Sequence, residues 1–370
     1  MEGFAFVTRK AGRPPRDDLA WLDEAAQLWD QAHADIGYLA RVFAQTSLPY
    51  RDPGEIPLWQ RRNGGLTLTL QPGVPLPAPD GTVSPIGYPF GTLPRLLLAW
   101  LTTEAVRTKS RTIPLGESLS DFCRQLQLPI TGLQIRRLKD QARRLFNARL
   151  SVHYVEHLHL EQRRQVRQEA GQNLIIASRY ELWTSTQRSP KATSDSTGAP
   201  TGATRPAGEA AVGIKGATTR RSKPEGKRAG TVGARQDVLA VEVALPSSVT
   251  LSAELYEEVT HRPVPVDIGA LRLLRGSPLR LDVYTWLTYR MSYLRKPVVV
   301  TWEQLRFQFG TQVSTPRGYR HFRADFSEAL RWVLAIYREA KVDEVANGIR
   351  LRPSPPHVSR GTRPALDRRD

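Results

Sequence analysis

The sequence predicts an α+β chain, mostly helical, in which a unit of helix, strand, helix, helix and hairpin occurs twice around a long disordered insertion. Three observations carry this prediction. Apolar residues recur at helical spacing in both halves, strand-like segments follow the helices of each half, and the stretch between the halves has almost no bulky apolar residue. The 370 residues are enough for two or three domains.

The first unit is predicted over residues 91–184. Apolar residues follow helical spacing around Pro94, which stands in a first helical turn, where a missing N–H group is tolerated. Ser118 and Asp121 resemble a capping box, which favours the start of a second helix. The expected elements are a helix over 91–107, a short strand over 112–115, a helix beginning at Ser118, a helix over 133–149, and strands over 150–160 and 173–184 that a charged stretch connects.

The second unit repeats this order. It forms the last part of the predicted domain 236–352, and a further strand and helix precede it in that domain. Ser277 before Pro278 is typical of a helix start, and Asn347-Gly348 predicts a tight hairpin turn. The expected elements are a helix from Pro278, a strand over 297–300, a helix capped by Thr301, a helix from Pro316 to about 340, and the hairpin. This order is that of tandem winged helix-turn-helix domains, in which the third helix enters the major groove.

Outside the two units, composition predicts little stable structure. Residues 185–235 hold ten basic and three acidic side chains and no aromatic residue, too little apolar surface to offset the entropy of ordering. The full division is a helical and extended region over 1–90, the first winged-helix domain over 91–184, a disordered basic linker over 185–235, the second winged-helix domain over 236–352 and a disordered basic tail over 353–370.

Positive charge is the strongest feature of the composition. The chain has 53 Lys and Arg against 36 Asp and Glu, a formal net charge of +17, which favours polyanionic partners such as nucleic acid. One cysteine, Cys123, excludes an internal disulfide. The sequence shows neither a secretory signal nor an apolar run near the ~20 residues of a membrane span. We therefore expect a cytoplasmic protein with no membrane partner.

The third helix of each unit supplies the candidate DNA-binding residues. In the second unit, Arg317 and Arg320 lie opposite the apolar side of the helix and are expected to read bases or phosphates, whereas Tyr319 fits the core equally well. In the first unit, Asp140 interrupts the arginine-rich face, so phosphate contacts are expected there. The predicted contacts are Thr315, Arg317, Tyr319, Arg320, His321 and Arg323 in the second unit and Arg136, Arg137, Lys139, Arg143 and Arg144 in the first. The same faces would also suit an ordinary solvated surface or a dimer contact.

The stretch Gly91–Ser110, GTLPRLLLAWLTTEAVRTKS, resembles the RepA family of plasmid replication initiators. The resemblance continues over 113–122 and 137–146, extends to 59–68 and 279–308, and covers most of 35–350 except the linker. It implies two winged-helix domains that bind direct repeats, called iterons, in the double-stranded DNA of a plasmid origin. It also implies local duplex opening, recruitment of the host helicase and initiator machinery, a homodimer, repression of the protein's own gene, and copy control. The family pattern lacks a linker as long as 185–235.

Two other functions remain open. The chain could be a winged-helix transcriptional repressor without initiator activity. It could also be a metal-dependent nicking endonuclease, because His157-Leu-His159 and Tyr293-Leu-Arg-Lys296 match motifs of rolling-circle nucleases. These motifs are far apart in sequence, and no phosphate-binding loop of the Gly-x-x-x-x-Gly-Lys type exists. We therefore expect no enzyme, no catalytic residue, no metal ion and no cofactor.

Overall fold

A computed structural model describes residue 25 and residues 35–75, 77, 80–116, 118–160, 164–182, 247–310 and 315–358. All of them belong to one compact unit, Met1–Trp183 with Ala244–Asp370. The second unit, Thr184–Val243, lies outside the described residues. The predicted linker, residues 1–24 and 26–34 of the predicted N-terminal region and the predicted tail from residue 359 lie outside the described residues, so their structure stays a prediction, as do the domain boundaries.

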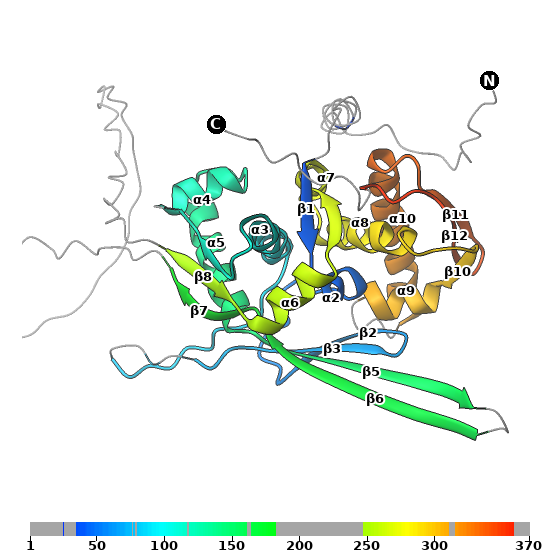
Figure 1. Cartoon of the computed structure of the whole chain (residues 1–370), viewed down its shortest axis with the longest axis horizontal. Coiled ribbons are helices and arrows are strands. Elements are labelled where there is room, and N and C mark those ends of the chain that lie inside the picture. Colours follow the sequence, from blue (N-terminus) through cyan, green and yellow to red (C-terminus); the bar gives the residue numbers. More distant parts are fainter. Residues whose placement is uncertain are drawn as a thin grey trace, which may run out of the picture. The chain divides into compact units, whose positions relative to one another are not determined.

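The described residues form a mixed α and β fold, which confirms this part of the predicted class (Figure 1). The helices are α2 (Arg41–Gln45), α3 (Thr92–Thr108), α4 (Leu119–Gln125), α5 (Gly132–Asn147), α6 (Ala253–His261), α7 (Ile268–Leu274), α8 (Pro278–Met291), α9 (Trp302–Phe309) and α10 (Pro316–Ile336). The strands are β1 (Ile36–Leu39), β2 (Trp59–Asn63), β3 (Leu66–Gln71), β4 (Thr112–Pro114), β5 (Arg149–Leu160), β6 (Arg164–Ile175), β7 (Ala177–Glu181), β8 (Ser248–Leu251), β9 (Val264–Asp267), β10 (Val298–Thr301), β11 (Lys341–Val345) and β12 (Gly348–Arg352).

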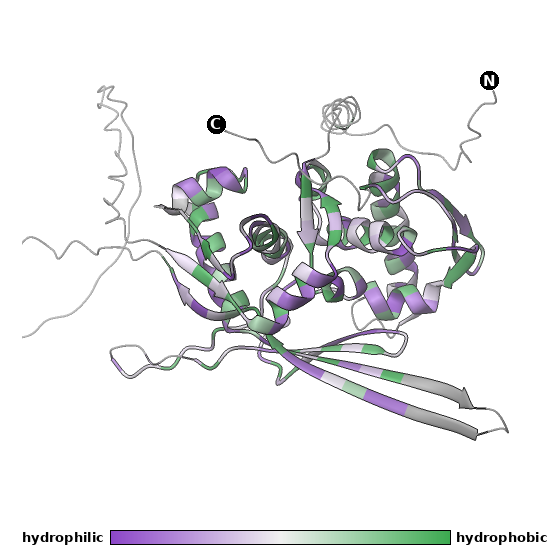
Figure 2. Cartoon of the chain, viewed as in Figure 1, coloured by the Kyte–Doolittle hydropathy of each residue, from purple (hydrophilic) through white to green (hydrophobic). Residues whose placement is uncertain are grey.

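The strands of the described residues pair in four small antiparallel sheets, with the orders β1-β9, β10-β12-β11, β2-β3-β5-β6 and β4-β8-β7. The helices α5 and α10 alternate hydrophobic and hydrophilic residues along their length (Figure 2). Their apolar sides, with α3 and α8, join one hydrophobic cluster. Among the described residues, no helix is long and apolar enough to cross a membrane.

From α8 to β12, the elements follow the predicted order. Pro278 stands at the start of α8, and Thr301 forms the predicted capping box of α9 with Gln304. Strand β10 pairs with β12, which places Val300 opposite Ile349, and β12 pairs with β11 across the turn at Asn347. The aromatic and aliphatic residues expected on the core side of α10 are buried: Phe322, Phe326, Ala329, Leu330 and Val333.

The turn of this hairpin brings Gly348 against β10. A Cβ atom at Gly348 would lie 2.1 Å from the Val300 carbonyl oxygen and 2.8 Å from the Thr301 Cα atom. These are backbone atoms that cannot rotate away, so Gly348→Ala is expected to destabilise the protein by about 1–3 kcal/mol. Urea unfolding measures this loss. Gly132→Ala is the matched control, because no atom lies within 4 Å of its Cβ position; equal unfolding midpoints for the two variants would contradict the prediction.

From α3 to β7, the structure corrects two expectations. The charged stretch before Gly171 is not a connection but part of β6, which begins at Arg164 and pairs with β5 along twelve residues. The strand predicted over 173–184 is therefore divided between β6 and β7. The short strand β4 also does not close a sheet within its own unit, because β8 lies between β4 and β7. Strand β8 alternates in burial, with Val249 and Leu251 fully buried, and it follows the predicted linker in sequence.

Candidate nucleic-acid interface

The first turns of α10 present the basic residues predicted for DNA contact. Thr315 caps the helix by accepting a hydrogen bond from the Gly318 backbone N–H at 3.2 Å. Arg317 and Arg320 are exposed, and His321 is exposed one helical turn after Arg317. The cap and Pro316 begin the helix at this point, while the buried side of α10 determines which side chains face solvent.

Four of the predicted residues of α10 also make contacts within the protein. The Arg317 Nε atom lies 3.4 Å from His321 Nε2. The guanidinium carbon of Arg323 lies 4.6 Å from the centre of the Trp302 ring, so this side chain packs on α9. Tyr319 is half-buried against the hydrophobic cluster, which agrees with the alternative prediction that it belongs to the core. Arg317, Arg320 and His321 therefore form the exposed basic face of α10.

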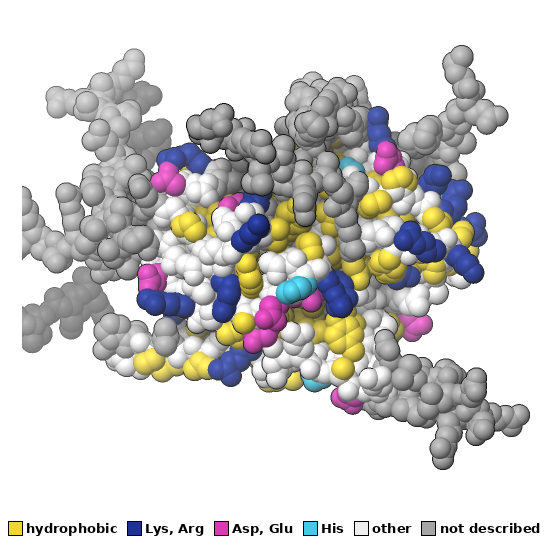
Figure 3. All heavy atoms as spheres, viewed as in Figure 1, with side chains coloured by type: hydrophobic (Ala, Val, Ile, Leu, Met, Phe, Trp, Pro, Cys, Tyr) yellow, Lys and Arg dark blue, Asp and Glu magenta, His cyan; other side chains and the backbone are white. Residues whose placement is uncertain are grey.

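The hairpin β11–β12 lies beside α10 and adds basic residues that the sequence analysis missed. The Ser327 hydroxyl of α10 donates to Glu344 Oε2 at 2.9 Å and joins the helix to β11. Arg350 is exposed on β12, where it lies between the buried Ile349 and Leu351, and Lys341 is exposed at the start of β11. Figure 3 shows Lys and Arg side chains grouped in the part of the view that holds β10–β12 in Figure 1. The alternation of Arg350 with the apolar residues Ile349 and Leu351 was the available sequence signal.

The basic residues of α5 divide into two kinds. Arg136, Arg137 and Arg143 are exposed, and Lys139 is half-buried. Arg144 instead packs into the fold, with 19% of its side chain exposed. Its guanidinium group forms ion pairs with Asp52 at 2.8 Å and Asp140 at 2.9 Å and lies over the Phe90 ring at 5.3 Å. Asp140, which interrupts the arginine face in the sequence, is therefore a partner of Arg144.

The structure does not bring the two predicted basic faces together. Helix α5 packs on α3 and α10 packs on α8, while α3 and α8 contact each other between them (Figure 1). Arg95 of α3 donates from Nε and Nη2 to the two carboxylate oxygens of Asp282 of α8, at 2.7 and 2.8 Å. Both side chains are buried, so this pair connects the two helices that support α5 and α10.

The residues of the nuclease alternative can be placed only in part. Tyr293 follows α8, and its hydroxyl accepts a hydrogen bond from Arg290 Nη1 at 2.7 Å. The side chains of His157 and His159 lie outside the described residues. Within the part of the chain that the structure describes, no three His, Cys, Asp or Glu side chains are grouped so as to hold a metal ion.

Comparison with known proteins places one segment in a family. Residues 234–304, which include β8, α6, β9, α7, α8 and β10, match the family model RepA_C, described as plasmid encoded RepA protein. The sequences of curated proteins contain no significant match. A crystal structure of RctB domains 2-3 is 12% identical, with 84% of this chain and 94% of that chain covered and a TM-score of 0.43. A selenomethionine derivative of domains 2 and 3 of RctB gives 12% identity, coverages of 86% and 97%, and a TM-score of 0.44.

The matched segment overlaps residues 279–308, one of the stretches that resemble the RepA family in the sequence, and it includes the whole of α8. It also includes Asp282, the partner of Arg95. Residues 234–304 are therefore similar to the plasmid encoded RepA protein family, in agreement with the family resemblance predicted from the sequence.

Proposed function

We propose that this protein is a plasmid replication initiator that binds direct repeats in the double-stranded DNA of its origin. The match of residues 234–304 to the family model of plasmid encoded RepA protein supports the role in plasmid replication. The exposed basic face of α10 is the single observation that carries DNA binding. Arg317 and Arg320 stand at the start of a 21-residue helix whose opposite side is anchored in the core. A helix end held in this way can enter a major groove, where arginine pairs with guanine edges.

In this proposal, the segments from α3 to β7 and from α8 to β12 act as two winged-helix units. The pairing of β10 with β12 supports this assignment for the second unit, because the hairpin then lies beside α10. Lys341 and Arg350 would contact the DNA backbone while α10 contacts the bases. In the first unit, Arg136, Arg137, Lys139 and Arg143 would contact phosphates, and Arg144 would position the helix.

The separation of α5 from α10 suggests how binding promotes opening. Helices α5 and α10 are supported by α3 and α8, which contact each other. In this proposal, α5 and α10 contact one duplex at two places. DNA that follows both contacts is bent or wrapped, and the cost of this deformation depends on the sequence being deformed. We propose that this strain falls on an adjacent AT-rich segment. We further propose that the protein recruits host helicase and initiator proteins and forms a homodimer. It would also repress its own gene and control the copy number of the plasmid in the cytoplasm.

The proposed mechanism uses binding energy alone. It needs no catalytic residue, metal ion or cofactor, so we propose that the protein is not an enzyme. Supercoiled plasmid incubated with the protein and divalent metal should therefore remain un-nicked. Nicking that Tyr293→Phe abolishes would contradict this and support the endonuclease.

Arg320→Ala tests the duplex interface. We expect the variant to lose about 1–3 kcal/mol of binding free energy on the repeats that flank its own gene and less on a scrambled duplex, because only base contacts discriminate. Fluorescence anisotropy at about 150 mM salt measures both affinities, since phosphate contacts dominate at lower salt. Arg275→Ala removes the same charge from an exposed site on neither α5 nor α10 and is the control. Equal losses on both duplexes would make Arg320 a phosphate contact, and no loss would exclude α10 from the interface.

Permanganate reactivity of thymines separates an initiator from a repressor. An initiator that opens its origin should make thymines beside the repeats reactive on supercoiled DNA, because unpaired bases are accessible to the reagent. Protection of the repeats without reactive thymines would leave a winged-helix repressor.

A further inference from the structure

A cavity of about 550 Å³ lies over the two-stranded sheet β1–β9, away from the basic face of α10. It is bordered by the carboxyl-terminal ends of α6 and α8 and by the start of α2. In the part of the view that holds α6 in Figure 1, Figure 3 shows basic, acidic, histidine and hydrophobic side chains close together. The volume falls within the range of about 300–1,000 Å³ that is typical of small-molecule sites.

One group of lining residues is aromatic. Tyr38 of β1 and Tyr289 of α8 are half-buried, and Tyr293 is 44% exposed. The Tyr289 and Tyr293 rings lie 5.1 Å apart, centre to centre, at an angle of 59°. Arg290 fixes Tyr293 through the hydrogen bond to its hydroxyl, and its guanidinium carbon lies 5.3 Å from the ring centre. Tyr293 is therefore an exposed ring held in place, which lowers the entropy that a stacking contact costs.

The other group is basic. Arg41, His261 and Arg262 line the same cavity, and His261 and Arg262 are exposed. The Arg41 Nε atom is buried and makes no hydrogen bond within the described residues. Arg41 forms an ion pair with Glu258, with 3.5 Å between Nε and Oε1, and 30% of its side chain is exposed. Arginine side chains at the wall of a cavity can hold an anionic oxygen such as that of a phosphate.

We propose that this cavity binds a nucleotide, with its base stacked on the tyrosine rings and its phosphate held by Arg41 and Arg262. Exposed aromatic rings beside arginines are the combination that binds the bases and phosphates of unpaired nucleotides. A base inside a duplex is already stacked on both faces, so the ligand is a free nucleotide or a nucleotide of a single strand. The site goes beyond the proposed duplex recognition, because its lining contains no residue of α5, α10 or the hairpin β11–β12.

Binding of a fluorescein-labelled dT10 strand to the full chain, followed by anisotropy, tests the proposal, with thymidine 5′-monophosphate as competitor. Tyr293→Ala should weaken dT10 binding about tenfold through lost stacking, and Arg262→Ala should weaken it through a lost phosphate contact. Tyr293→Phe keeps the ring but loses the hydrogen bond from Arg290, so it should bind dT10 more weakly than the wild type and more tightly than Tyr293→Ala. Arg275→Ala removes a charge outside the cavity and is the control for Arg262→Ala.

The outcomes separate this site from the duplex interface. Competition by the free nucleotide would support a pocket for one nucleotide, and binding of dT10 without such competition would support a pocket for a strand. Binding of dT10 that Tyr293→Ala and Arg262→Ala leave unchanged would overturn the proposal, as would the failure of both probes to bind. Affinity for the gene-flanking duplex should stay the same in Tyr293→Ala. The proposed duplex interface on α10 and the proposed nucleotide site can therefore fail independently of each other.

Discussion

Arg95→Met is expected to lower the free energy of unfolding by about 3–5 kcal/mol, the cost of removing one partner of a buried ion pair. The Arg95 and Asp282 side chains are only 8% and 7% exposed. Arg95 also donates to the carbonyl oxygens of Leu48 at 2.7 Å and Gly91 at 2.6 Å. The variant therefore leaves a buried carboxylate and backbone acceptors without their donor. Urea unfolding at pH 7 measures the loss.

The loss in Arg95→Met should depend on pH. Burial raises the pKa of Asp282, and Arg95 lowers it again. Without Arg95, the folded state binds a proton at Asp282 more tightly than the unfolded state does. Stability of the variant relative to wild type should therefore recover as the pH falls below 7. A loss that does not change with pH would mean that the missing hydrogen bonds to the backbone, not the uncompensated charge, destabilise the variant.

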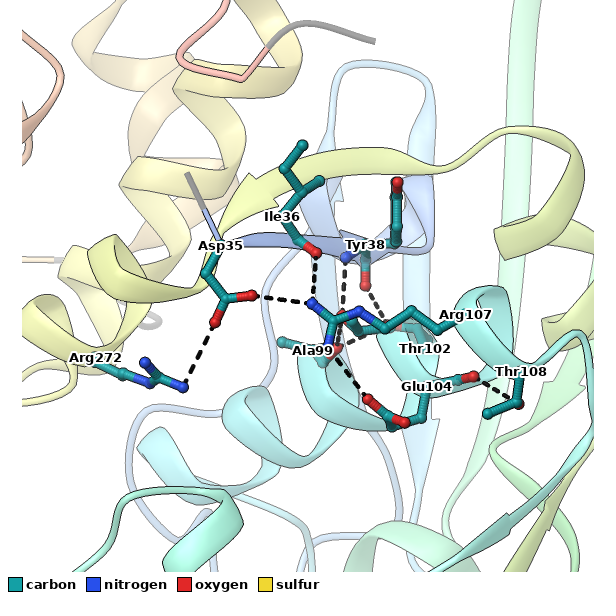
Figure 4. Close-up of polar contacts among 10 residues, drawn as sticks. Asp35, Ile36, Tyr38, Ala99, Thr102, Glu104, Arg107, Thr108 and Arg272 are labelled. Atoms are coloured by element: carbon teal, nitrogen blue, oxygen red, sulfur yellow. Dashed lines mark hydrogen bonds and ion pairs between the residues drawn. The ribbon is translucent and has the colours of Figure 1, made fainter. Parts of the chain in front are cut away.

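Arg107→Met is the matched control, since it also breaks an ion pair between an arginine of α3 and an aspartate. Figure 4 shows Arg107 directed at Asp35, which Arg272 also approaches. Arg107 and Asp35 are 41% and 45% exposed, so the expected cost is about 0–1 kcal/mol. The double variant Arg95→Met with Asp282→Leu removes both charges of this pair, so part of the lost stability should return, while the buried Arg61 loses its attraction to Asp282. Equal unfolding midpoints for Arg95→Met and Arg107→Met would contradict the structural role of the buried pair.

Lowering the pH from about 6.5 to 4 is expected to remove about 3 kcal/mol of stability through His357 alone. Burial lowers the pKa of His357 to about 4. In the unfolded chain, the imidazole has its ordinary pKa near 6.5, so between these values the unfolded state binds a proton that the folded state does not. The contribution is therefore complete above pH 6.5 and is lost as the pH falls.

The contacts of His357 explain why it stays neutral. Its Nδ1 atom lies 2.8 Å from the hydroxyl of Tyr284, and that hydroxyl accepts a hydrogen bond from the Asp267 backbone N–H at 2.9 Å. When Nδ1 is unprotonated, it accepts the proton of the Tyr284 hydroxyl, which favours the neutral imidazole. The Tyr337 ring covers His357 at 5.0 Å, centre to centre. These contacts hold the segment after β12 against α8 and α10.

His357→Phe should remove this part of the pH dependence while lowering stability at pH 7 through the lost hydrogen bond. Urea unfolding at several pH values between 4 and 7.5 measures both effects. His321→Phe replaces an exposed histidine of α10 and is the control for the loss of an imidazole. A His357→Phe profile parallel to that of the wild type would show that other groups cause the acid sensitivity.

Local sequence signals predicted the helices and hairpin from α8 to β12 because each signal lies within a few residues of the structure it determines. The Thr301 capping box, Pro316 at a helix start and the Asn347-Gly348 turn act between neighbours in the chain. The apolar side of α10 likewise follows from helical periodicity. The same reasoning found the exposed arginines of α10, because a helix with one buried side must expose the other.

The arrangement from α3 to β7 was less predictable. A charged strand such as β6 has no apolar alternation to reveal it, and only the twelve-residue pairing with β5 stabilises it as a strand. In the sequence, Arg144 could not be distinguished from its exposed basic neighbours on α5. In the structure it is packed into the fold, where it forms an ion pair with Asp52, a residue far away in the sequence. The cavity over β1 and β9 combines Tyr38 with His261 and Tyr293, residues that no local pattern connects.

The sequence by itself determined the resemblance to the RepA family, the mixed helix and strand content, and the basic face of α10, since these depend on composition and on contacts between near neighbours. Tertiary structure alone decided that β8 lies between β4 and β7, that Arg95 meets Asp282, and that a tyrosine and arginine cavity exists. The physical reason is that burial depends on which distant segments come together. A charged side chain is placed inside only when a partner elsewhere in the chain compensates the cost of removing it from water.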